Sequence, residues 1–259
     1  MVAADPDPRQ HKANVASRFG DVASVYDTVV EFFGPFGRAL VEAAAITRGE
    51  HVLDIACGAG AVLGPATATG ASVWGVDIAP EMAARARVFA PTALADAEHL
   101  PAADSAFDAV MCGFGVFFFP DPARAFAEVR RVLRPTGRFA ASTFADGVAG
   151  FPWSTELARE VGRPSPWKQS PVVKVDGLRA ALHDTGFTSV VTTRVERRFS
   201  FNDIEHYQAW YGTHGGAQLL HELADDAGRL GHWRRRSTVL LERDGYAFTQ
   251  RVDLTVADR

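Results

Sequence analysis

The stretch VLDIACGAG at residues 52–60 constrains this chain more than any other feature, because an apolar run leads directly into Gly58 and Gly60. The run predicts a buried strand. Glycines placed directly after a strand let the backbone turn sharply into a helix and let a ligand lie against the turn. This unit is typical of α/β folds that bind a cofactor at the carboxyl end of a parallel sheet, although nicotinamide-dependent folds open in the same way.

The residues around this turn indicate the charge of the ligand. The third glycine of the dinucleotide-binding fingerprint would fall at position 63, which is Leu63. The sequence therefore lacks the glycine that allows the close packing of helix on strand at a pyrophosphate site. Asp54 lies inside the strand, where a carboxylate attracts an ammonium group and repels a phosphate. Asp77 ends the next predicted strand, where it can accept hydrogen bonds from a ribose. The pattern favours an adenosyl cofactor with an amino group, and a nicotinamide-dependent oxidoreductase is the alternative.

Apolar runs and helical patterns alternate along the first half of the chain, which indicates βαβ units around a parallel sheet. The predicted strands of this part cover residues 51–56, 72–78, 92–97, 107–114 and 137–144. Asp121 and Pro122 mark the start of a helix. A further helix is expected near 176–187. The alternating segments 188–201 and 246–257 predict an antiparallel pair at a sheet edge.

Composition excludes several classes of function. A chain of 259 residues with 47% hydrophobic residues can bury one large domain, and its net charge of -4 offers no cationic surface for nucleic acid. Two cysteines make no disulfide framework, and no apolar run approaches the roughly 18 residues of a membrane span. We expect a cytoplasmic protein with no membrane contact and, since no HExxH or CxxC spacing is present, no metal site.

Four motifs in register carry a resemblance to a known family. They are VLDIACGAG at 52–60, VDIAPEM at 76–82, DAEHLP at 96–101 with the following FDAV, and LRPTGRF at 133–139. In these motifs the chain resembles class I S-adenosylmethionine-dependent methyltransferases, in particular those of ubiquinone and menaquinone biosynthesis. The resemblance implies a Rossmann-like α/β fold with a seven-stranded sheet of order 3-2-1-4-5-7-6 and helices on both faces. It also implies S-adenosyl-L-methionine as cofactor and methyl transfer to an O, N or C atom of a small molecule.

Carried over residue by residue, the resemblance implies a cofactor site. Asp54, Ala56 and Gly58 would line the methionine portion, and Asp77 would hold the ribose. The remaining positions are Ile78 and Met82 beside the adenine, Asp96, Ala97 and Glu98 at its edge, Cys112 and Gly113 at the amino group, and Tyr26 as the tyrosine that closes over the cofactor. After the fourth strand the chain has GFGVFFFPDP where many relatives carry Asn or His, so no catalytic group is carried over from there.

The parts outside these motifs predict a covering structure. Residues 1–35 are expected to form cofactor-closing helices, and residues 36–259 a methyltransferase domain with cap insertions at about 146–175 and 202–236. Candidate substrate-binding residues are the aromatic side chains of Phe118, Trp153, Trp210 and Tyr211. For Phe118 core packing is an equal alternative, for Trp153 covering the sheet is equally plausible, and for Trp210 and Tyr211 the alternative is a surface or interface helix.

The candidate general bases are His206 and His214, which are spaced for one face of a helix with Trp210 between them. A surface or interface helix explains that spacing as well. We expect a monomer or homodimer that acts on a small molecule, with secondary metabolism as one context. The alternative within the same fold is a cofactor-binding cyclase or regulatory module that transfers no methyl group.

Overall fold

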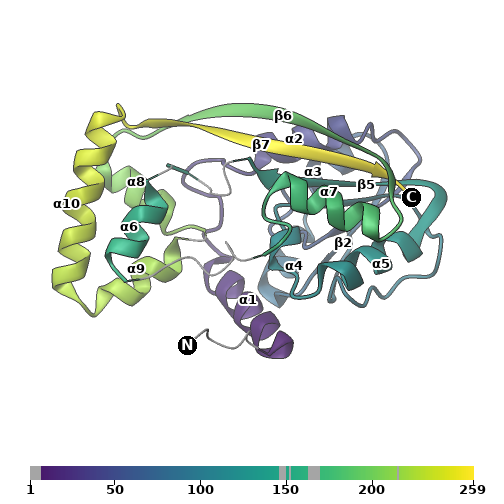
Figure 1. The fold of residues 1–259 in the computed structure, drawn as a ribbon, viewed down its shortest axis with the longest axis horizontal. Coiled ribbons are helices and arrows are strands. Elements are labelled where there is room, and N and C mark those ends of the chain that lie inside the picture. Colours follow the sequence, from purple (N-terminus) through teal and green to yellow (C-terminus); the bar gives the residue numbers. More distant parts are fainter. Residues whose placement is uncertain (1–6, 146–149, 152, 163–169, 215) are drawn as a thin grey trace.

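The structure is a computed structural model and describes residues 7–145, 150–151, 153–162, 170–214 and 216–259. Figure 1 shows an α/β lobe, a helical cap at the other end of the molecule, and two long strands that run across both. Helix α1 (Pro8–Val22) lies below the junction of the two parts. Among the described residues, no helix is both long enough and apolar enough to cross a membrane.

One seven-stranded sheet organises the α/β lobe, with the order β3-β2-β1-β4-β5-β7-β6. Its strands are β1 (His51–Ile55), β2 (Ser72–Asp77), β3 (Thr92–Leu94), β4 (Phe107–Gly113), β5 (Leu133–Phe144), β6 (Thr188–Ser200) and β7 (Ala247–Asp258). Strands β1 to β5 pair in parallel, and β7 pairs antiparallel with both β5 and β6. The predicted strand order is therefore confirmed.

The last two strands differ from each other more than their sequences indicate. Both alternate, yet of the two only β6 lies at an edge of the sheet and is mostly exposed, whereas β7 lies between β5 and β6 and is mostly buried. The structure also ends β3 at Leu94, because the next residues turn away and Asp96 pairs with His99 instead.

Helices cover both faces of the sheet (Figure 1). They are α2 (Gly34–Ala43), α3 (Leu63–Ala68), α4 (Pro80–Ala86), α5 (Pro122–Val132) and α7 (Val175–Asp184). Helix α5 begins where the sequence predicts, because the Asp121 carboxylate accepts a hydrogen bond from the Arg124 backbone N–H at 3.0 Å. Its apolar face, which includes Phe126 and Val129, is completely buried.

The cap is built from α6 (Ser154–Glu160), α8 (Ile204–Tyr211), α9 (Ala217–Ala224) and α10 (Ala227–Arg243). The second predicted insertion thus contains three helices, and the last of them continues past residue 236. Of the first predicted insertion, residues 146–149, 152 and 163–169 lie outside the described residues.

Aromatic side chains join the cap to the sheet in one continuous core. Trp210 of α8 and Trp233 of α10 are both almost fully buried. The Trp210 ring centroid lies 5.7 Å from that of Phe248 on β7 and 5.6 Å from that of Phe32. The cap is therefore packed directly on the amino-terminal end of β7, where Phe248 lies.

Helix α2 packs closely on the segment that follows β1. A Cβ added at Gly37 would lie 2.0 Å from the carbonyl oxygen of Ala61, so only a glycine lets the helix approach the turn this closely. Because backbone cannot move aside like a flexible side chain, a larger residue at position 37 must push the helix or the turn out of place.

We expect Gly37→Ala to lower the free energy of unfolding by about 1–3 kcal/mol, the usual cost of overpacking. Chemical denaturation of the purified variant measures this. The matched control is Gly228→Ala at the exposed start of α10, where the added methyl meets only ordinary contacts and stability is unchanged or slightly raised. Equal stability of the two variants would contradict the close packing at Gly37.

Candidate functional site

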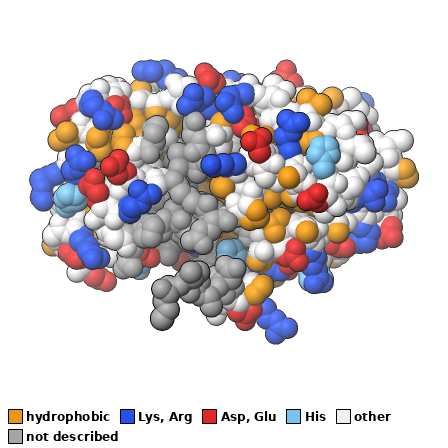
Figure 2. All heavy atoms as spheres, in the orientation of Figure 1, with side chains coloured by type: hydrophobic (Ala, Val, Ile, Leu, Met, Phe, Trp, Pro, Cys, Tyr) orange, Lys and Arg blue, Asp and Glu red, His pale blue; other side chains and the backbone are white. Residues whose placement is uncertain are grey.

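A cavity of about 400 Å³ opens at the carboxyl ends of β1, β2 and β4, where ligands bind in open α/β sheets. Its lining includes the N-terminal segment with Lys12 and Tyr26, the turn after β1, the strand ends, and the cap with Tyr211. Figure 2 shows hydrophobic side chains at the surface near the middle of the molecule, beside residues that the structure does not describe.

The turn after β1 forms an open wall of this cavity. The Cys57 N–H donates to the Val76 carbonyl at 3.0 Å and ties the turn to β2. Gly58 has φ +52°, and a Cβ added there would meet nothing within 4 Å. Gly60 has φ +95°, and a Cβ there would collide with the ring of Phe89. The two glycines thus serve different purposes: Gly58 leaves space for a ligand, and Gly60 accommodates a neighbouring ring.

Asp54 is the most unusual polar residue of the cavity. Its side chain is 1% exposed, and neither of its carboxylate oxygens has a hydrogen-bond partner among the described residues. Burial, together with the charge of Asp77, raises its pKa well above the ordinary value. An isolated buried carboxylate is unfavourable unless a cation or a donor meets it. The position therefore suits the ammonium group of a ligand.

Asp77, at the end of β2, holds the turn in shape. One carboxylate oxygen accepts a hydrogen bond from Gly58 N–H at 2.8 Å, and the other accepts from Ala79 N–H at 2.8 Å. Burial raises its pKa, although these backbone hydrogen bonds oppose the shift. Each oxygen keeps a second lone pair, which can accept from the hydroxyls of a ribose.

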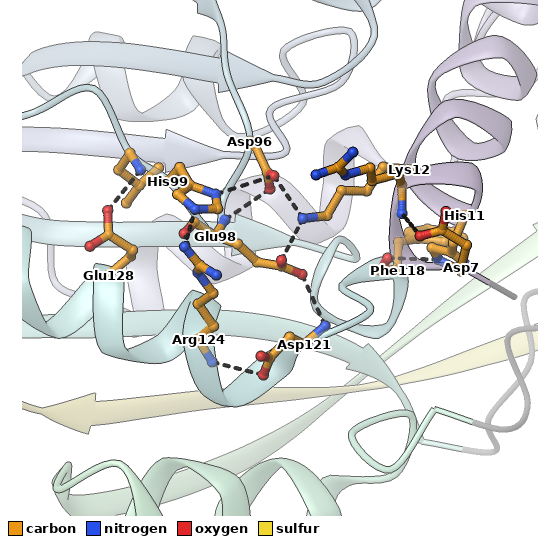
Figure 3. Close-up of polar contacts among 12 residues, drawn as sticks. Asp7, His11, Lys12, Asp96, Glu98, His99, Phe118, Asp121, Arg124 and Glu128 are labelled. Atoms are coloured by element: carbon orange, nitrogen blue, oxygen red, sulfur yellow. Dashed lines mark hydrogen bonds and ion pairs between the residues drawn. The ribbon is translucent and has the colours of Figure 1, made fainter. Parts of the chain in front are cut away.

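Beyond Asp77 the cavity lining includes the apolar residues Ile78, Met82 and Ala97 and a charged group. There Lys12 of α1 donates to the carboxylates of both Asp96 and Glu98 (Figure 3). Burial opposes the effect, but the hydrogen bond from Lys12 holds the pKa of Asp96 below its ordinary value.

The cavity brings together most of the residues expected in the site. Those that line it are Tyr26, Asp54, Ala56, Gly58, Asp77, Ile78, Met82, Asp96, Ala97, Gly113, Phe118, Tyr211 and His214. Those that do not are Glu98, Cys112, His206, Trp153 and Trp210. Cys112 is buried in β4 behind the cavity wall, and the Glu98 side chain is bonded to Lys12 and to the Asp121 N–H.

Helix α8 ends at Tyr211, but the four-residue spacing still brings the rings of Trp210 and His214 together, with centroids 4.3 Å apart. His206 does not line the cavity, and its ring accepts a hydrogen bond from Asn202 N–H at 3.3 Å. Trp210 packs inside the cap core.

Trp153 also packs in the cap. Its ring stacks on Phe151, and its indole N–H donates to Asp244 at 2.9 Å.

His214 is the one candidate base that the structure places in the cavity wall. It is buried, and its Nδ1 has no hydrogen-bond partner within the described segments. Burial lowers its pKa to about 4, so the ring is neutral near pH 7. A neutral imidazole can orient a hydroxyl or amine, but one with so low a pKa is a weak proton acceptor.

Sequence reasoning missed several lining residues. Phe33 stacks on Tyr26 with ring centroids 5.3 Å apart, and Phe114 stacks on Phe144 at 4.5 Å. Ser142 of β5 accepts a hydrogen bond from the Phe114 N–H at 3.1 Å and so supports a residue with φ +59°. Among the phenylalanines, the sequence predicts only Phe118 in the cavity, because nothing local indicates that residues 33 and 144 belong to it.

This fold and site define a Rossmann-like protein with the architecture of class I S-adenosylmethionine-dependent methyltransferases. Residues 53–141 match the family described as "Methyltransferase domain". The chain is 39% identical over 142 residues to aklanonic acid methyltransferase DauC of Streptomyces sp. (strain C5), covering 50% of this chain and 64% of that protein. It is 37% identical over 148 residues to the ubiquinone/menaquinone biosynthesis C-methyltransferase UbiE of Ralstonia pickettii (strain 12J), covering 51% of this chain and 60% of the relative.

Among solved structures, a putative methyltransferase from Bacillus halodurans C-125 has the same fold, with a TM-score of 0.58. Its sequence is 21% identical, and the match covers 86% of this chain and 97% of that one. Residues 53–141 are thus similar to a methyltransferase domain, and the resemblance to class I S-adenosylmethionine-dependent methyltransferases is supported by these relatives and by the shared fold. The chain spans less than two thirds of the length of the two curated relatives above.

We expect Asp54→Asn to weaken the binding of S-adenosylmethionine about 10- to 100-fold, since a charge-assisted contact is lost. Without ligand the same variant should be more stable than wild type at pH 8. A carboxyl whose pKa is raised by folding binds its proton more tightly in the folded state, so stability falls as pH rises above the ordinary value near 3.8.

Calorimetric titration and denaturation between pH 5 and pH 8 test both effects. Asp184→Asn, at an exposed position at the end of α7, is the matched control and should alter neither. An Asp54→Asn variant that binds the cofactor normally, or that is less stable than wild type at every pH, would show that the Asp54 carboxylate does not bind a cationic group of the ligand.

Proposed function

We propose that this chain binds S-adenosyl-L-methionine in the cavity and transfers its methyl group to a small-molecule acceptor. The observation that carries the proposal is Asp54, a buried carboxylate that has no hydrogen-bond partner among the described residues and lies beside an open glycine turn. The cofactor has a cationic amino group, a ribose and an adenine, and the cavity has polar groups suited to each. The names of the two curated relatives support the same activity.

Each part of the wall has a task in this proposal. Asp54 and the carbonyl of Gly113 accept from the amino group, and the space at Gly58 admits the methionine portion. The free lone pairs of Asp77 accept from the ribose. Asp96 accepts from the adenine amino group while the backbone N–H of Ala97 donates to the ring. Ile78 and Met82 pack against the faces of the adenine.

When bound, S-adenosylmethionine supplies an electrophilic methyl group on a positively charged sulfur. The residues of the chain hold the reactants in position and provide the surroundings of the cationic sulfur. Tyr26 and Phe33 present stacked aromatic rings to the cavity, and such ring faces stabilise a nearby cation by about 0.5–2 kcal/mol. Holding two reactants in line is worth about 7–11 kcal/mol, and the departing thioether is neutral, so no acid is needed on that side.

A general base is required only for acceptors that must lose a proton. Of the two histidine candidates, His206 lies outside the cavity, and burial makes His214 a poor base. We propose that His214 acts as a neutral hydrogen-bonding group that orients the acceptor, together with the hydroxyl of Tyr211 in the same wall. Phe118 contributes an apolar contact.

The proposal includes several wider expectations. Residues 1–35 act as the cofactor-closing segment and residues 36–259 as the capped catalytic domain. The chain works in the cytoplasm as a monomer or homodimer, with a small molecule as its partner and without nucleic acid. An acceptor in secondary metabolism agrees with the relative DauC, whose name specifies aklanonic acid.

Titration with S-adenosylmethionine, followed by incubation with methyl-labelled donor and a panel of phenols, amines, quinones and polyketide-like acceptors, tests the function. We expect binding and transfer of label to at least one acceptor class. Binding without transfer to any acceptor would favour the cyclase or regulatory alternative. Binding of NADH but not of S-adenosylmethionine would overturn the assignment.

We expect His214→Gln to keep kcat within about fivefold of wild type, because an amide also donates and accepts hydrogen bonds. His214→Phe, which removes them, should reduce kcat/KM by about 10- to 100-fold. His206→Gln, outside the cavity, should behave as wild type. Steady-state kinetics with the best acceptor of the panel measure these effects. If His214→Gln were as inactive as His214→Phe, His214 would be the general base and not only an orienting group.

A further inference from the structure

Helix α1 is fastened to the α/β lobe at the adenine end of the cavity. Lys12 Nζ donates to Asp96 Oδ2 at 2.7 Å and also to Glu98 Oε2 (Figure 3). The Lys12 side chain is 19% exposed and that of Glu98 is 6% exposed, so water screens these ion pairs only in part. One residue earlier, the ring of His11 forms a hydrogen bond with the Phe118 carbonyl at 3.0 Å.

The two acids are held by their own lobe before Lys12 is considered. Asp96 Oδ1 accepts from the Glu98 N–H at 2.9 Å, and Glu98 Oε1 accepts from the Asp121 N–H at 2.9 Å. Their remaining oxygens converge on Lys12, as Figure 3 shows. Two carboxylates side by side repel each other, and a shared ammonium group removes that repulsion. Lys12 thus completes a site whose other members are already fixed.

The rest of α1 docks with few buried groups. All of its residues, 8–22, are described, and Val22 alone among them is buried. Val22 belongs to a small cluster with Ala79 and Met82, against which Phe19 and Tyr26 pack. That cluster holds the C-terminal end of the helix. The N-terminal end is held by polar contacts, which include the Lys12 ion pairs and the His11–Phe118 hydrogen bond.

We propose that Lys12 is the positioning residue that fastens α1 over the adenine end of the cofactor cavity, by joining the carboxylates of Asp96 and Glu98. The inference rests on the proposed function, since it concerns the same cofactor site. Lys12 itself lines the cavity, so α1 must move before an adenine can leave past it. Opening therefore includes the rupture of two partly buried ion pairs, and Lys12 controls how fast the cofactor is exchanged.

The dissociation rate of S-adenosylhomocysteine from the full-length protein tests this by displacement stopped-flow. We expect Lys12→Met to release the ligand about tenfold faster than wild type, the effect of losing a charge-assisted contact. Lys12→Arg, which keeps the charge, should restore most of the slow release. Lys174→Met, the same substitution at an exposed position before α7, should release the ligand at the wild-type rate.

Two further readouts separate fastening from a general loss of structure. Amide hydrogen exchange should show that S-adenosylhomocysteine protects α1 in wild type but not in Lys12→Met, while β1 and β2 stay protected in both. Raising the salt concentration should speed release from wild type and leave Lys12→Met unchanged, because salt screens an ion pair. Release from Lys12→Met as slow as from wild type, with α1 still protected, would overturn the inference. Failure of wild type to bind the ligand at all would instead overturn the proposed function.

Discussion

The fold and the site depend on how two acidic side chains are buried away from water at the ends of adjacent strands. Asp77 is stabilised from within, because its oxygens accept backbone hydrogen bonds that also shape the glycine turn. Asp54, on the neighbouring strand, receives no such help from the described residues. The fold tolerates this cost through a large hydrophobic core, and the site gains a position that a cationic ligand stabilises far more than a neutral one.

The α/β part could be predicted from sequence because its signals are local. Near-continuous apolar runs such as 107–114 identify strands buried on both faces, and Pro122 marks the beginning of a helix. Parallel strands then place their carboxyl ends at one edge, so Asp54, Asp77 and Asp96 had to lie near one another. The strand order came from the family resemblance, since local patterns alone do not specify it.

Residues that meet through tertiary contacts could not be predicted. Lys12 and Asp96 are 84 positions apart, and nothing around Lys12 distinguishes it from a solvated lysine on a polar helix. The histidine spacing in the cap suggested one helical face, but of the two histidines only His214 lines the cavity. Trp153 and Trp210 were candidate pocket residues, and packing with Phe151 and Phe248 places them in the core.

The long antiparallel pair β6 and β7 has a mechanical consequence. Both strands continue without a break from the sheet to the cap, where Phe199 pairs with Phe248 near the cap core. The cap therefore cannot rotate relative to the sheet without bending this hydrogen-bonded pair of strands. Under the proposed function, the cofactor would therefore be exchanged past the amino-terminal wall of the cavity, and the rigid cap would limit the size of the acceptor.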